Sequence, residues 1–173
     1  MKKRFSKIIA LVVAIIAVLS ITGCGMQPAT VPKENKVKIS EFSDKATGVE
    51  AICKTLKEKE YISEDNCIKT SADLIGAKSG YRMDGVAVNG SQFSVEIYEF
   101  EDTNSELAKS TIKSVKENGS FSLFGRTVSY AYMSDNDKYL LIYPDKKSVS
   151  DKEKDAENVT RKDEFLQVIN SAK

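Results

Sequence analysis

The chain has 173 residues and a formal net charge of +1, from 26 Lys+Arg and 25 Asp+Glu, and it contains neither histidine nor tryptophan. The lack of histidine excludes Ser-His-Asp and Cys-His catalysis and removes the commonest general base and metal ligand. We therefore expect no cofactor and no bound metal.

The N-terminus has the pattern of an export signal. A basic start is followed by an uncharged apolar run over residues 8–19, which is short for a membrane span of roughly 20 residues. The next residues, Ile21-Thr22-Gly23-Cys24, resemble the lipobox of bacterial lipoproteins, in which the cysteine carries a diacylglyceryl group and becomes the first mature residue. An ordinary secretory signal and an uncleaved membrane helix are the alternatives.

The resemblance implies a signal peptide over residues 1–23, lipidation of Cys24 and anchoring at the extracytoplasmic face of the cell membrane. The lysine-rich, tryptophan-free composition is typical of a Gram-positive source. Residues 1–23 hold four of the 26 basic residues and none of the 25 acidic ones, so the rest of the chain has a net charge of −3. This mildly acidic balance argues against a nucleic-acid partner and against electrostatic binding of the domain as a whole to anionic lipid.

Proline and polar residues predict a flexible tether over 24–42 that includes the lipidated cysteine, followed by a single domain over 43–173. Within the tether, weak alternation over 36–42 is compatible with an edge strand. Apolar spacing predicts a helix over 47–59, with Thr47 and Glu50 as a capping box. A polar turn over 63–66 and a short helical turn over 71–75 follow, and Gly76 ends the latter.

The clearest local signal is a hairpin of strands 81–88 and 92–100 around Asn89-Gly90, which suits a turn with positive φ at both central residues. Alternation in the second strand places Phe93, Val95 and Ile97 in the core. A helix then runs from Asn104 or Ser105 to about Glu117 and ends at a glycine.

Three short strands are expected over 121–124, 126–133 and 138–143, and an amphipathic helix closes the chain around residues 165–169. The charged run over 148–158 reads as a solvated helix face or loop. Adjacent strands joined by short turns predict an α+β fold with an antiparallel sheet of about four to five strands and helices packed mainly on one face.

Several groups are candidate sites. Cys53 and Cys67 are a candidate disulfide in an exported protein, or else two buried thiols. The clustered carboxylates of Glu96, Glu99, Glu101 and Asp102, and those of Asp135 and Asp137, are candidates for calcium binding or acid–base chemistry; turn chemistry and solubilising charge are the simpler interpretation.

The segment Gly76-Ala77-Lys78-Ser79-Gly80 lacks the spacing of a phosphate loop and reads as a turn. It resembles a segment of small lipoproteins of gut Firmicutes that carry no assigned activity, over about residues 49–143. Tyrosines are numerous and suit core packing or, on an uncovered sheet face, recognition. They are Tyr81, Tyr98, Tyr130, Tyr132, Tyr139 and Tyr143.

These observations predict a non-enzymatic, membrane-anchored binding or interaction module at the cell envelope. Its expected partners are the membrane, through the lipid anchor, and an envelope protein, a peptide or a wall component. A carboxylate-dependent envelope hydrolase is the alternative, and it requires two acidic side chains about 5–10 Å apart in a cleft.

Overall fold

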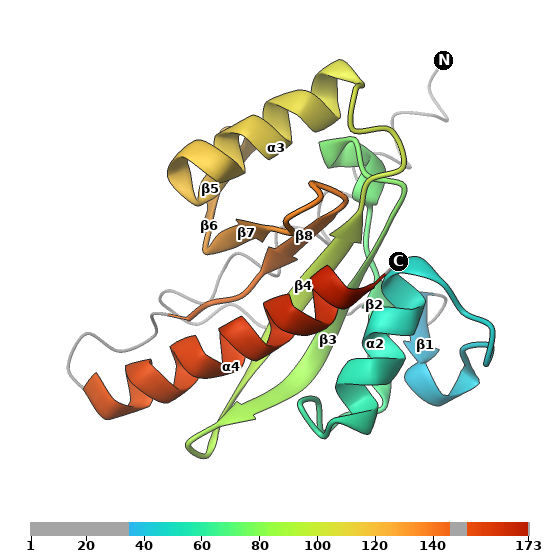
Figure 1. Ribbon diagram of the computed structural model, residues 1–173, viewed down its shortest axis with the longest axis vertical. Coiled ribbons are helices and arrows are strands. Elements are labelled where there is room, and N and C mark those ends of the chain that lie inside the picture. The colour runs from blue at the N-terminus through green and yellow to red at the C-terminus, as the bar shows by residue number, and fades with distance from the viewer. Residues whose placement is uncertain (1–34, 146–151, 173) are drawn as a thin grey trace, which may run out of the picture.

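A computed structural model describes residues 35–145 and 152–172 (Figure 1). A six-stranded sheet has the order β1-β2-β3-β4-β8-β7, every neighbouring pair is antiparallel, and β5 and β6 form a separate two-stranded sheet. The strands are β1 Lys36–Lys38, β2 Asn66–Lys69, β3 Ser79–Val88, β4 Ser91–Glu99, β5 Ser120–Leu123, β6 Arg126–Ser129, β7 Ala131–Met133 and β8 Tyr139–Ile142. The helices are η2 Ile39–Glu41, α2 Gly48–Glu58, η3 Ala72–Ile75, α3 Glu106–Asn118 and α4 Lys152–Ser171.

The predicted α+β class is confirmed, with a sheet slightly larger than the expected four to five strands. Two of the α-helices in the described part of the chain, α2 and α4, pack together on one face of the sheet, as Figure 1 shows. The third, α3, packs with η3 and the β5–β6 hairpin against the other face. The sheet is therefore covered on both faces, by two α-helices on one face and by one α-helix with shorter elements on the other.

The β3–β4 hairpin forms as the sequence predicts. Asn89 and Gly90 have φ values of +49° and +74°, and Val88 pairs with Ser91 across the two-residue turn. The register then shifts between Met83 and Val86, where Gly85 has a φ of +85°. Such a bulge bends the strand and changes which residues face each other further along it.

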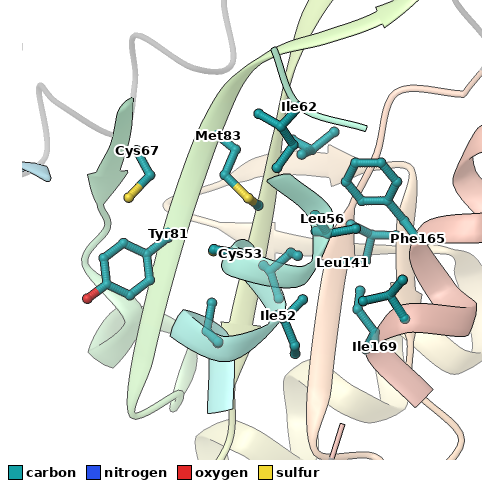
Figure 2. Close-up of a cluster of buried hydrophobic side chains, with 14 of the residues drawn as sticks. Ile52, Cys53, Leu56, Ile62, Cys67, Tyr81, Met83, Leu141, Phe165 and Ile169 are labelled. Carbon is teal, nitrogen blue, oxygen red and sulfur yellow. The ribbon is translucent and has the colours of Figure 1, made fainter. Parts of the chain in front are cut away.

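Alternation along β4 divides its side chains between two cores. Phe93, Val95 and Ile97 are buried against α2 and α4, as predicted. Tyr98 and Phe100 belong to the second core, with α3. Figure 2 shows the first core, in which Ile52, Cys53 and Leu56 of α2 lie between the sheet and the side chains of α4.

The N-terminus of α2 is capped by a residue distant in sequence. Thr47 makes no side-chain capping bond, so the predicted capping box is wrong. Instead, the Glu99 carboxylate accepts a hydrogen bond from the Val49 backbone N–H at 3.4 Å, where the positive end of the helix dipole favours an anion. Glu50, the other half of the predicted box, accepts a hydrogen bond from the Tyr81 hydroxyl at 2.9 Å.

Two other segments differ from the sequence prediction, and a third forms the edge strand that the sequence allowed. Residues 66–69 form β2, although only residue 66 had an assignment, as the end of a polar turn. The edge strand considered over 36–42 is present as β1, and with η2 it places residues 36–41 in the fold rather than in the tether. Ile39 and Phe42 are both buried. The strand expected over 126–133 is split into β6 and β7 by Tyr130, whose φ is +60°.

Substitution of Gly48 tests the cap of α2. Gly48 has a φ of +62°, and a Cβ there would lie 2.0 Å from Glu99 Oε2. We expect Gly48→Ala to lower the free energy of unfolding by about 2–4 kcal/mol, measured by urea denaturation, because backbone strain and the displaced carboxylate act together.

The matched control is Gly90→Ala, because Gly90 has a similar φ of +74° but no atom within 4 Å of the position that a Cβ would take. The free energy of unfolding of this variant should fall by only about 1–2 kcal/mol, the cost of placing an alanine in the left-handed conformation. Equal losses in the two variants would contradict a role for Glu99 as the cap.

Candidate functional site

A cluster of polar side chains lies on the sheet face opposite α2 and α4. We call it the Glu96 cluster, and it consists of Arg82 and Asp84 from β3 with Ser94, Glu96 and Tyr98 from β4. These positions alternate with the residues that fill the first core, so their side chains face the other way. The Arg82 and Glu96 Cα atoms are direct partners in the β3–β4 ladder.

Hydrogen bonds and ion pairs connect the cluster. The Tyr98 hydroxyl donates a hydrogen bond to Glu96 Oε2, and the Ser94 hydroxyl donates one to Asp84 Oδ1 at 2.5 Å. Arg82 Nε lies 3.3 Å from Asp84 Oδ1, close enough for an ion pair but without the alignment of a hydrogen bond. Arg82 Nη2 donates a hydrogen bond to Asp84 Oδ2 at 3.5 Å, and the positive charge of the same guanidinium acts to lower the pKa of Glu96.

Glu96 is 7% exposed, and burial raises the pKa of its carboxyl group. The hydrogen bond from Tyr98 and the charge of Arg82 act in the opposite direction and offset part of this effect. A carboxyl group with a raised pKa can act as a general acid, but only where a substrate can reach it. The burial of Glu96 and its bond to Tyr98 make a structural role the better interpretation.

The other predicted carboxylates of the β4 end face lysines. Lys138 Nζ lies 3.5 Å from Glu99 Oε1, and Lys78 Nζ lies 2.8 Å from Glu101 Oε1. These four residues line an open surface depression of about 420 Å³. Its lining therefore mixes both charges instead of presenting a pair of free carboxylates.

A second open depression, of about 520 Å³, lies beside α3. Lys116 Nζ contacts both oxygens of Asp137 at 3.0 Å there. Asp135 is placed by its backbone N–H, which donates to Asn170 Oδ1 at 3.0 Å, and Asp102 accepts from the Asn104 N–H at 2.8 Å. The acidic residues that are close in sequence thus serve as turn anchors and ion-pair partners.

Within residues 35–145 and 152–172, no group of three or more Cys, Asp or Glu side chains is arranged to hold a metal ion. The glycine-containing segment 76–80 begins as the predicted turn, in which Gly76 has a φ of +77° and ends η3, and its last two residues open β3. Lys78 of that segment faces Glu101.

Cys53 and Cys67 are both buried in the first core and carry free thiols (Figure 2). Cys53 comes from α2, whereas Cys67 comes from β2 and its thiol donates to the Val37 carbonyl at 3.5 Å. Burial raises the pKa of Cys53 well above its usual value and that of Cys67 to about 12. The disulfide between them, expected if the chain is exported, stays a prediction.

Most of the tyrosines contribute to the cores rather than to a recognition face. Tyr81, Tyr98, Tyr139 and Tyr143 are buried, and Tyr132 is partly buried. Tyr130 is 38% exposed. The tyrosine-based recognition surface considered from the sequence is therefore not assembled by these residues.

Cys24 and the lipobox-like run lie outside the described residues. None of the helices in the described part of the chain is long and apolar enough to cross a membrane. No protein-family model matches the chain, and searches of curated proteins and of solved structures also return no match.

The pH dependence of stability tests the Glu96 cluster. The pKa of Glu96 is raised in the folded state, so ionisation of this group lowers the free energy of unfolding. This destabilisation is absent below the unfolded-state pKa near 4.5 and is fully developed above the folded-state pKa. We expect Glu96→Gln to raise the melting temperature at neutral pH, with the gain disappearing as the pH falls toward 4.5.

The control is Glu101→Gln, whose side chain is 70% exposed and should change stability by no more than about 0.5 kcal/mol at either pH. A Glu96→Gln variant that is less stable than the wild type at neutral pH would show that the Tyr98 hydrogen bond and the charge of Arg82 stabilise the carboxylate more than burial disfavours it.

Thiol accessibility tests the placement of the two cysteines. In the reduced, folded chain we expect maleimide at pH 8 to label neither Cys53 nor Cys67, because both are buried and their raised pKa values leave little thiolate. Both should react in denaturant. Rapid labelling of either thiol in the native protein, detected by mass spectrometry, would contradict the structure.

Proposed function

We propose that this chain is a bacterial lipoprotein whose α+β fold serves as a non-enzymatic binding or interaction module at the cell envelope. The observation that carries the proposal is the run Ile21-Thr22-Gly23-Cys24 directly behind a basic start and an apolar segment. Lipidation of Cys24 with a diacylglyceryl group would supply two acyl chains, which is enough for stable anchoring where one chain is marginal.

The start of the described fold supports this arrangement. The first strand, β1, begins at Lys36, so about 12 residues separate it from Cys24. Fully extended, they span about 40 Å at roughly 3.3 Å per residue. A globular domain of this length has a radius of gyration of about 14 Å, so such a tether lets any face of the domain turn toward the membrane.

The non-enzymatic part of the proposal draws on the lack of histidine and on the environment of the acidic residues. A carboxylate-dependent hydrolase needs two carboxyl groups that converge on a bond from a cleft. Glu96 is buried against Tyr98, and Glu99, Glu101 and Asp137 each face a lysine. These contacts favour structural uses of the carboxylates over the alternative of a hydrolase.

The anchor is tested on the protein purified from the membranes of cells that express the full chain. We expect mass spectrometry to find Cys24 as the first residue, with an attached diacylglyceryl group. Cys24→Ala should abolish the modification and move the protein out of the detergent-rich phase on phase separation. Cys53→Ala, which changes a buried thiol, is the control and should leave both properties unchanged.

An unmodified Cys24, or one that remains inside an uncleaved chain, would overturn the anchor. The interaction role is tested in the same cells by crosslinking, where the lipidated protein should yield a defined envelope partner that Cys24→Ala loses. Recovery of only abundant background proteins from both would count against an interaction module.

A further inference from the structure

The tip of the β5–β6 hairpin exposes a large apolar side chain. Leu123 pairs with Arg126 across a two-residue turn made by Phe124 and Gly125. Phe124 is 58% exposed, the highest value among the exposed large hydrophobic residues of the described chain. Most of the other large apolar side chains in the described residues are buried in one of the two cores.

The backbone of this turn is unfavourable for phenylalanine. The φ values are +50° at Phe124 and +75° at Gly125, the pattern of a turn with both central residues left-handed. The β3–β4 turn has almost the same values, +49° at Asn89 and +74° at Gly90. Asparagine tolerates this conformation, whereas a bulky side chain there is a backbone outlier.

The chain therefore builds the same turn twice, once with the residue that local sterics favour and once against them. Neither the turn nor the core requires an aromatic ring at position 124, because the side chain points largely into solvent. Backbone outliers that the fold does not require are associated with functional positions.

The surroundings of Phe124 show what kind of partner it fits. Between Glu117 and Asp135 the sequence has a single charged residue, Arg126, in a chain that is 29% charged overall. Ser122, Arg126 and Thr127 are exposed beside the tip. An aromatic ring next to an arginine, with no acidic residue nearby in sequence, matches the boundary between acyl chains and anionic headgroups.

We propose that the β5–β6 tip is a membrane-contact site, where Phe124 inserts into the headgroup region and Arg126 faces lipid phosphates. The proposal rests on the lipid anchor at Cys24, which would hold the domain beside the bilayer. Its effect is to orient the anchored domain, with the β5–β6 hairpin toward the membrane.

The strength of the contact favours a membrane over a protein partner. Burial of the 58% of Phe124 that is exposed gives on the order of a 5- to 20-fold gain in partitioning, and an arginine at an anionic surface adds about fivefold. A gain of this size is too small to recruit a protein partner from solution. It is enough to orient a domain that is already tethered to the membrane. A single ring flanked by polar side chains is also far smaller than a standard protein interface of about 800 Å² per partner.

The test uses tryptophan as a reporter, because the chain contains none. The chain from Cys24 onward, which holds every described element, is coupled through the Cys24 thiol to a maleimide lipid in vesicles of phosphatidylcholine and phosphatidylglycerol. The buried Cys53 and Cys67 should not react. Phe124→Trp is compared with Asn89→Trp, which places the same reporter on a turn of the same backbone geometry.

We expect the Phe124→Trp emission to shift to the blue and to be quenched by brominated lipid, with the effect reduced by Arg126→Gln or by phosphatidylcholine alone. The Asn89→Trp emission should stay that of a solvent-exposed indole. Phe124→Asn, the residue used at the other turn, should keep or raise the melting temperature while the tethered domain loses its fixed orientation.

No shift or quenching in Phe124→Trp, or equal effects in both tryptophan variants, would overturn the membrane contact. A tip that stays unquenched but crosslinks to an envelope protein would replace the membrane by a protein partner. The vesicle tether is chemical, so this result does not depend on lipidation in the cell. Failure here and failure of the Cys24 anchor are therefore separate outcomes.

Discussion

The pairing of β3 with β4 is the constraint on which the rest of the structure depends. It is the longest ladder of the sheet, and its strands occupy the two central positions between β2 and β8. Alternate residues of β4 supply both cores, so the loss of this pairing would remove packing from α2 and α4 on one face and from α3 on the other. The end of the same strand also carries Glu99, which caps α2. One strand thus links the sheet, both cores and a helix terminus.

Local signals in the sequence predicted this element well, because they depend on a few neighbouring residues. Asn89-Gly90 determines the turn and the alternation of Phe93, Val95 and Ile97 determines the buried face. β2 was missed because its four residues have only one fully buried side chain, Cys67, and receive their pairing from β1 and β3. The cap of α2 was missed for a similar reason: Glu99 is 50 residues away from Val49.

The Glu96 cluster shows how a single bulge hides a site from sequence reasoning. Continued regularly from the Val88–Ser91 pair, the hairpin register would place Arg82 opposite Ile97, whereas the shift at Gly85 places it opposite Glu96. Arg82 and Glu96 are therefore direct neighbours across the ladder only because of the bulge. Gly85 was the available signal, since an isolated glycine within a strand pattern often marks a bulge. The carboxylates were visible in the sequence, but their partners were not.

Glu96 and Phe124 both break local rules, and they do so differently. Glu96 is a buried carboxyl group, but Tyr98 and Arg82 account for its position within the fold. Phe124 is strained in its backbone and exposed in its side chain, and it belongs to neither of the two cores. Since natural sequences are largely consistent between local preference and global structure, an uncompensated violation indicates a constraint from outside the folded domain. If Cys24 carries the lipid that we propose, the domain is held beside a bilayer, and the bilayer is then the nearest source of that constraint.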